Sequence, residues 1–228
     1  MIPESEIGLY VQDTMDELEF IMGAVTTPFG ALRASLGYPN PWTIKYVEIG
    51  NEDDLGGSEA SYIAYRFKAY YDAISAKYPD IIIISSSGDT LEQMGNSATD
   101  FHEYTRPDQF VSQFGYWDNI ANREHLTLIG EYANIQWNVP TITGVDWSAP
   151  KLPFPIWVGA VAETVFSLGA ERNGYGIIGM SYAPGFQNIN SWEWSVRLPP
   201  PLFLAAAKII TARPHLLQRR PFPDRPLH

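Results

Sequence analysis

The chain has 228 residues, enough for one domain or most of one, and its apolar fraction of 45% is ordinary for a protein with a packed core. Its formal net charge of −11 argues against nucleic acid or an anionic membrane surface as a partner. The absence of cysteine excludes disulfides, thiolate catalysis and cysteine-ligated zinc.

Helical and strand patterns alternate along the chain. Apolar residues at three- and four-residue spacing predict helices, and short runs of β-branched and aromatic residues predict strands. The expected helices cover residues 7–23, 31–36, 59–77 (with Ser58 as N-cap), 106–117 and 156–171. The expected strands cover residues 43–50, 81–84, 99–104, 126–132 and 174–182. Between the second and third strands, residues 89–95 are expected to form a short helix or loop.

Five strands alternating with helices indicate an α/β fold with a parallel sheet. A right-handed β/α path fits part of a (β/α)8 TIM barrel, and a doubly wound open sheet is the alternative. No Gly-x-Gly-x-x-Gly follows any expected strand, so nothing indicates a dinucleotide site.

The composition changes near Trp194. We expect residues 1–194 to form the partial barrel, followed by a Pro/Arg-rich tail over residues 195–228. The tail is nearly free of acidic residues, which indicates a disordered extension or an aberrant gene end, while a basic C-terminal tail is the plainer interpretation. The N-terminus lacks the basic and apolar regions of a signal peptide, and no apolar run is long enough to span a bilayer.

Two expected strands end in glutamate. The strand 43–50 leads into Gly50-Asn51-Glu52, and the strand 126–132 carries Gly130-Glu131. Sites of TIM barrels lie at the C-terminal ends of the strands, so both carboxyls would point into one mouth. Two carboxylates are what glycoside hydrolysis needs, although unrelated surface glutamates would give the same spacing.

These motifs resemble the α-L-arabinofuranosidases of glycoside hydrolase family 51, and the fungal members in particular. The resemblance runs from about Val11 to Asn190 and includes the stretches Tyr46–Glu52, Phe101–Tyr104 and Ile129–Ala133. It implies a retaining enzyme on a (β/α)8 barrel, with this chain covering about strands four to eight. The first strands and the family's β-sandwich domain would then be missing, as in a fragment or a truncated gene model.

The resemblance also implies roles for individual residues. Glu52 would be the acid/base and Glu131 the nucleophile, with no metal or other cofactor. Asn51 would bind the sugar 2-hydroxyl, while His102 and Tyr104 would lie against the catalytic pair, where a Tyr hydroxyl can keep a nucleophile ionised. His102 as a capping histidine and Tyr104 as a core residue are the alternatives.

Glu48 and Glu103 are expected to point away from the site because side chains alternate along a strand.

The partner implied by the resemblance is an arabinofuranosyl-containing polysaccharide or oligosaccharide of the plant cell wall, and the implied location is extracellular. A non-catalytic remnant and a barrel glycosidase acting on xylan or β-glucan are the competing functions.

Overall fold

A computed structural model of the chain describes residues 2–87, 97–118, 126–139, 141, 144–152 and 155–183. The expected short helix or loop at 89–95 and the tail over 195–228 lie outside the described residues. None of the helices in the described ranges combines the length and apolar character that a membrane span requires.

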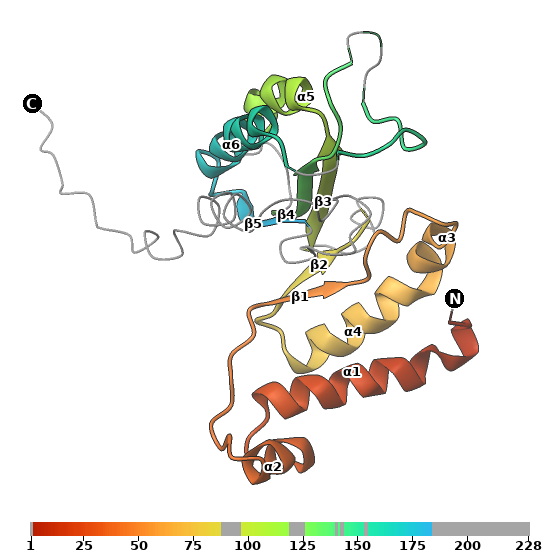
Figure 1. Ribbon diagram of the computed structural model, residues 1–228. Coiled ribbons are helices and arrows are strands. Elements are labelled where there is room, and N and C mark those ends of the chain that lie inside the picture. Colours follow the sequence, from red (N-terminus) through yellow and green to blue (C-terminus); the bar gives the residue numbers. More distant parts are fainter. Residues whose placement is uncertain are drawn as a thin grey trace, which may run out of the picture.

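The five expected strands form one parallel sheet whose spatial order follows the chain (Figure 1). The strands are β1(Tyr46–Ile49), β2(Ile82–Ser85), β3(Ala98–Thr105), β4(Thr127–Asn134) and β5(Ile177–Tyr182). A doubly wound sheet reverses its strand order at a switch point, and this sheet does not. The prediction of a partial (β/α)8 barrel is therefore confirmed, and the open-sheet alternative is wrong.

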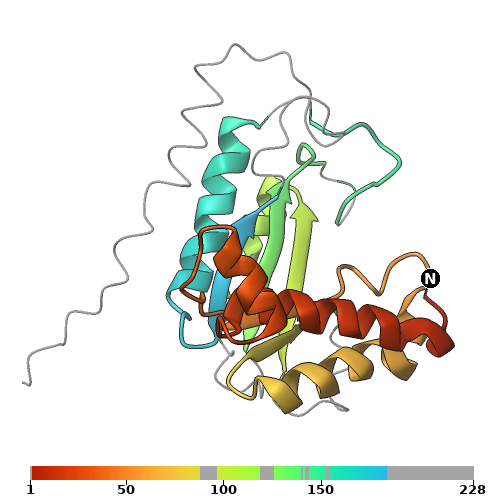
Figure 2. The same cartoon turned by 90° about the horizontal axis from the view of Figure 1, so that it is seen from below.

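Helices connect and flank these strands (Figures 1 and 2). They are α1(Ile7–Met22), α2(Pro28–Ser35), α3(Glu59–Ser61), the π-helical turn η2(Tyr62–Arg66), α4(Phe67–Lys77), α5(Pro107–Ser112), the short 3-10 helix η4(Gln113–Gly115) and α6(Trp157–Glu171), with a further 3-10 turn η1(Glu4–Glu6) before α1. Helix α4 packs on β1, α6 packs on β4 and β5, and α1 lies against α2 and α4.

Two main clusters of buried side chains hold the helices to the sheet. The first joins α1 and α4 to β1 and β2 and includes Leu18, Phe67 and Ile83. The second joins α5 and α6 to β4 and β5 and includes Phe110 and Phe166. The apolar stripes expected on these helices therefore face the sheet, and the strand tips remain free to carry polar groups.

The helix expected over residues 59–77 is interrupted by the π-helical turn η2. Ser58 does not cap it through its side chain, because the Ser58 hydroxyl donates instead to the carbonyls of Asp53 and Leu55. Ser58 does occupy the N-cap position, as predicted, and its carbonyl accepts from the Tyr62 backbone amide at 3.1 Å. Its hydroxyl stabilises the turn that follows β1, which is where Glu52 lies.

Candidate active site

The chain turns sharply directly after β1. Gly50 has a φ of +91°, and Glu52 is left-handed with a φ of +48°. A side chain at position 50 would collide with the Asp53 carboxylate and lie 2.7 Å from the Ser86 hydroxyl, so the close approach requires glycine. A left-handed glutamate costs of order 1–3 kcal/mol and persists only where its surroundings hold it.

Asp53 holds this turn. Its carboxylate accepts hydrogen bonds from the Asn51 amide at 3.1 Å and the Ser86 hydroxyl at 2.9 Å. It also pairs with Arg66 at 2.6 Å, and the Asp53 side chain is 8% exposed. A buried carboxylate with three such partners fixes the backbone on both sides of Glu52.

Strands β3 and β4 bring the next groups to the same place. His102 is directly opposite Glu131 in the sheet, whereas Asp100 is opposite Leu128. Strand β4 therefore carries one more residue than β3 between these pairs, which is a β-bulge next to Glu131. Glu131 was expected to end its strand, but β4 continues to Asn134.

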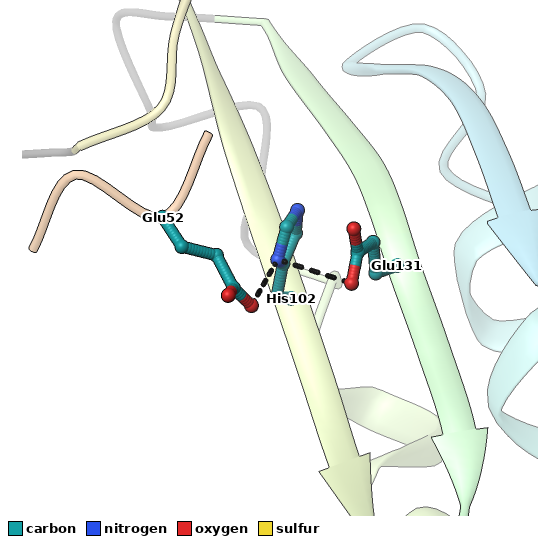
Figure 3. Close-up of side chains that lie close together, drawn as sticks. All are labelled: Glu52, His102 and Glu131. Carbon is teal, nitrogen blue, oxygen red and sulfur yellow. Dashed lines mark hydrogen bonds and ion pairs between the residues drawn. The ribbon is translucent and has the colours of Figure 1, made fainter. Parts of the chain in front are cut away.

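Figure 3 shows the imidazole of His102 between the two glutamates. Its Nδ1 lies 2.9 Å from Glu52 Oε1 and 3.6 Å from Glu131 Oε2. One carboxylate oxygen of each glutamate and a ring nitrogen of His102 all lie within 4.8 Å of one another. The Tyr104 hydroxyl donates a hydrogen bond to Glu131. Four of the five predicted site residues are thus brought together by β1, β3 and β4.

The fifth, Asn51, lies beside Glu52 on the exposed turn after β1. Its backbone amide is committed to Asp53. The residue itself is exposed.

The cluster is built around a positive charge. Burial lowers the pKa of His102, but hydrogen bonds to Asp100 and Glu52 and the charges of Asp100 and Glu131 outweigh it and raise the pKa to about 9. The imidazole is then protonated at neutral pH and balances the carboxylates around it. Glu52, His102 and Glu131 thus form a compact group of ionisable side chains.

Glu48 belongs to the surroundings of the site, and the prediction that it points away is wrong. Glu48 is hydrogen-bonded to Asp100 and lies close enough to His102 and Glu131 to interact with their charges. Partial desolvation of the carboxyl, followed by the charge of Asp100, raises the pKa of Glu48 to about 7. Glu103 does point away, because its carboxyl is hydrogen-bonded to Gln113 of η4 on the helical side.

Two residues of the site were not predicted. Asp100 lies 2.5 Å from His102 Nε2, and its place two residues before His102 on the same strand was a usable signal. Trp147 is 57% exposed and meets the Tyr104 ring edge-on at 6.2 Å between ring centres. Trp147 lies in a loop, where no periodic pattern could place it.

Comparison of the sequence with known protein families identifies the family of this chain. The sequence profile described as the α-L-arabinofuranosidase 1 domain matches residues 1–123, a stretch that includes Glu52, His102 and Tyr104. The chain belongs to the α-L-arabinofuranosidase family. The resemblance read from the sequence motifs is confirmed.

Fungal members of the family are among the similar proteins. Over 190 residues, which are 82% of this chain, it is 44% identical to α-L-arabinofuranosidase A of Aspergillus niger. Over 208 residues it is 40% identical to α-L-arabinofuranosidase A of Aspergillus kawachii. The chain spans 28% of the length of the first relative and 30% of the second.

Solved structures of the family share the fold. The arabinose-bound GH51 α-L-arabinofuranosidase MgGH51 matches 91% of this chain and 34% of its own, at 29% identity and a TM-score of 0.73. The Thermotoga maritima α-L-arabinofuranosidase, in complex with arabinose, matches 76% of this chain and 40% of its own, at 19% identity and a TM-score of 0.59. The five-stranded sheet therefore corresponds to part of the catalytic barrel of these enzymes.

Proposed function

We propose that this chain carries the catalytic pair of a retaining glycoside hydrolase that releases terminal α-L-arabinofuranosyl residues. The observation that carries the proposal is the meeting of Glu52 and Glu131, with an oxygen of each within 4.8 Å of the other and both beside His102. Retaining glycosidases hold their carboxyls about 5–5.5 Å apart and inverting ones roughly 6.5–9.5 Å. The short separation supports retention.

The proposed reaction has two displacements. Glu131 attacks the anomeric carbon while Glu52 protonates the departing glycosidic oxygen, which leaves an arabinosyl ester on Glu131. Glu52 then takes a proton from water, and the oxygen of that water attacks the same carbon and releases Glu131. Both carboxyls are partly exposed, with 34% of the Glu52 side chain and 30% of the Glu131 side chain accessible, so a sugar can reach them.

The neighbouring residues have supporting roles in this proposal. The hydrogen bond that Tyr104 donates to Glu131 holds the carboxyl of the nucleophile in place. His102 provides the positive charge that lets two glutamates lie together. Asn51, an exposed residue directly before Glu52, is proposed to bind the sugar 2-hydroxyl. None of these steps uses a metal or an organic cofactor.

The proposed substrates are arabinan and arabinoxylan side chains, which carry terminal arabinofuranosyl groups. The relatives are named for the same activity, and the aromatic Trp147 beside Tyr104 offers an apolar surface of the kind that sugar rings contact. An extracellular place of action follows from this choice of substrate. A carbohydrate substrate also agrees with the net charge of −11, which disfavours polyanionic ligands.

The test is the release of p-nitrophenol from its α-L-arabinofuranoside by the purified chain and by variants. Glu131→Ala and Glu52→Ala are each expected to lower kcat by about 10²–10⁴-fold, the range of a lost acid/base or nucleophile. Azide is expected to restore turnover in Glu52→Ala, because azide needs no general base. The sugar azide should retain the configuration of the substrate.

Other outcomes distinguish the competing functions. No release of nitrophenol from folded wild-type chain would favour a non-catalytic remnant. Faster cleavage of a xyloside or glucoside would favour a barrel glycosidase with another substrate. A product of inverted configuration would contradict the double displacement.

A further inference from the structure

One buried carboxylate on β3 contacts both halves of the site without touching either glutamate. The Asp100 side chain is 3% exposed, and its Oδ2 lies 2.5 Å from His102 Nε2. Its Oδ1 accepts a hydrogen bond from the Gly130 amide at 2.9 Å. His102 is bonded to Glu52, and Gly130 directly precedes Glu131, so Asp100 is one residue removed from each catalytic carboxyl.

We propose that Asp100 is the positioning residue of this site: it orients His102 toward the two glutamates and holds the β4 bulge that aims Glu131. It thereby sets the separation of the two carboxyls. The inference deepens the proposed function and rests on it only in taking Glu52 and Glu131 as the reacting pair.

The contact with His102 fixes which way the ring faces. An imidazole can rotate about its bond to the chain, and a strong acceptor at Nε2 leaves Nδ1 on the opposite side. In this structure Nδ1 faces both Glu52 and Glu131. Because the acceptor is an ionised carboxylate, it also favours a proton on both ring nitrogens. A ring that donates at both ends holds Glu52 at a fixed distance from β3.

The contact with Gly130 fixes the direction of Glu131. The extra residue in β4 disturbs the ladder to β3 between Asp100 and His102. The Asp100 carboxylate supplies the acceptor for the Gly130 amide within this bulge. A side chain at position 130 would collide with that carboxylate, which explains a glycine directly before the nucleophile.

The charges around His102 are consistent with this arrangement. The titratable groups that face the ring are Glu52 on the turn after β1, Glu48 on β1, Asp100 on β3 and Glu131 on β4, with Tyr104 of β3 bonded to Glu131. Burial raises the pKa of Asp100, but the hydrogen bond and charge of His102, followed by hydrogen bonds with Glu48 and the Gly130 amide, outweigh burial and hold that pKa below its ordinary value. Asp100 is thus an anion that the imidazolium and a backbone amide both stabilise.

The test measures His102 itself, so it does not need turnover. Ring resonances of His102 are followed against pH by NMR in wild-type chain, with His102→Gln used to identify them among the four histidines. We expect the wild-type ring to remain protonated at pH 7. In Asp100→Asn, loss of the charged partner should lower the titration midpoint by about 1–3 pH units.

A matched control removes the same charge elsewhere. Asp72 on α4 pairs with Lys68 in an exposed contact, with 57% of the Asp72 side chain accessible. Asp72→Asn should leave the His102 midpoint unchanged. An unchanged midpoint in Asp100→Asn would overturn the proposal, and so would a wild-type midpoint at or below the ordinary histidine value of about 6.5, which needs no variant to fold.

An activity measurement separates this inference from the proposed function. If the wild-type chain hydrolyses the arabinofuranoside, Asp100→Asn should lower kcat by about 10²-fold with little change in KM, because misplaced carboxyls act on the transition state. A kcat equal to wild type would overturn the positioning role. If wild-type chain has no turnover, the proposed function fails, and the NMR midpoints still decide the role of Asp100.

Discussion

At the scale of single residues, Tyr104 links β3 to the proposed nucleophile. Its hydroxyl donates to Glu131, and the Trp147 ring lies against its ring. The place of His102 and Tyr104 beside the catalytic pair was implied by the resemblance to the family, and in the structure both lie at alternate positions of β3 and so share a face. The same alternation carries Asp100 onto that face.

Tyr104→Phe tests this hydrogen bond. A hydrogen bond to a charged group contributes about 1.5–3 kcal/mol, which corresponds to roughly a 10–100-fold loss of kcat/KM. The loss should appear because the hydroxyl no longer holds the Glu131 carboxyl in place. Tyr38→Phe, at a residue 58% exposed on the surface, is the control and should leave kcat/KM unchanged. A wild-type kcat/KM in Tyr104→Phe would show that the hydroxyl does not act on the nucleophile.

At the scale of elements, the turn after β1 and the bulge in β4 decide where the carboxyls point. The apolar runs around Ile83 and Ile129 predicted the strands, since buried parallel strands have this composition. The bulge was not predictable, because it depends on the register between β3 and β4. The left-handed Glu52 was not predictable either, because its conformation depends on Asp53, Ser86 and Arg66, which only the fold brings together.

Substitution of Gly50 tests the turn against a matched glycine. Gly37 and Gly50 both have positive φ, +96° and +91°, but a side chain at position 37 would meet nothing within 4 Å. Gly37→Ala should therefore cost only the left-handed strain of about 1–2 kcal/mol. Gly50→Ala should cost more, because its methyl group would also displace Asp53 from Asn51. The measurement is the free energy of unfolding in urea, and equal losses for the two variants would contradict the account of the turn.

At the scale of the whole molecule, the described residues form an incomplete ring of strands that already brings both carboxyls together. Alternation of strands and helices predicted this arrangement, since consecutive right-handed β/α units lie side by side. The domain division at residue 194 stays a prediction, because the segment after 183 lies outside the described residues. The chain matches about a third of the length of MgGH51, and the half-barrel is the part that carries Glu52 and Glu131.

Stability should fall as the pH rises, because buried groups hold protons in the folded state. Burial raises the pKa of Glu163 on α6 to about 8, where its carboxyl accepts from the Asn134 amide. Between pH 4.5 and 8 the folded state keeps a proton on Glu163 that the unfolded state has released. The free energy of unfolding therefore decreases as the pH rises through this range. His102 has the same sign: its stabilisation is complete below pH 6.5 and is lost as the pH rises through about 9.

Glu163→Gln isolates the larger of these effects. The variant keeps an oxygen for the Asn134 amide but has no proton to lose. Wild-type stability should decline between pH 5 and 8 by up to about 1.4 kcal/mol per pH unit more steeply than that of the variant. Urea unfolding at a series of pH values measures the difference. Parallel curves for the two proteins would contradict a protonated Glu163 in the folded chain.

The central claim is that Glu131 and Glu52 act as nucleophile and acid/base in one double displacement. The most direct measurement is mass spectrometry of Glu52→Ala after incubation with p-nitrophenyl α-L-arabinofuranoside. Without Glu52 to activate water, the ester should accumulate, and peptide mapping should place one arabinosyl group on the peptide that contains Glu131. No adduct on folded protein, or an adduct on another carboxylate, would contradict the claim.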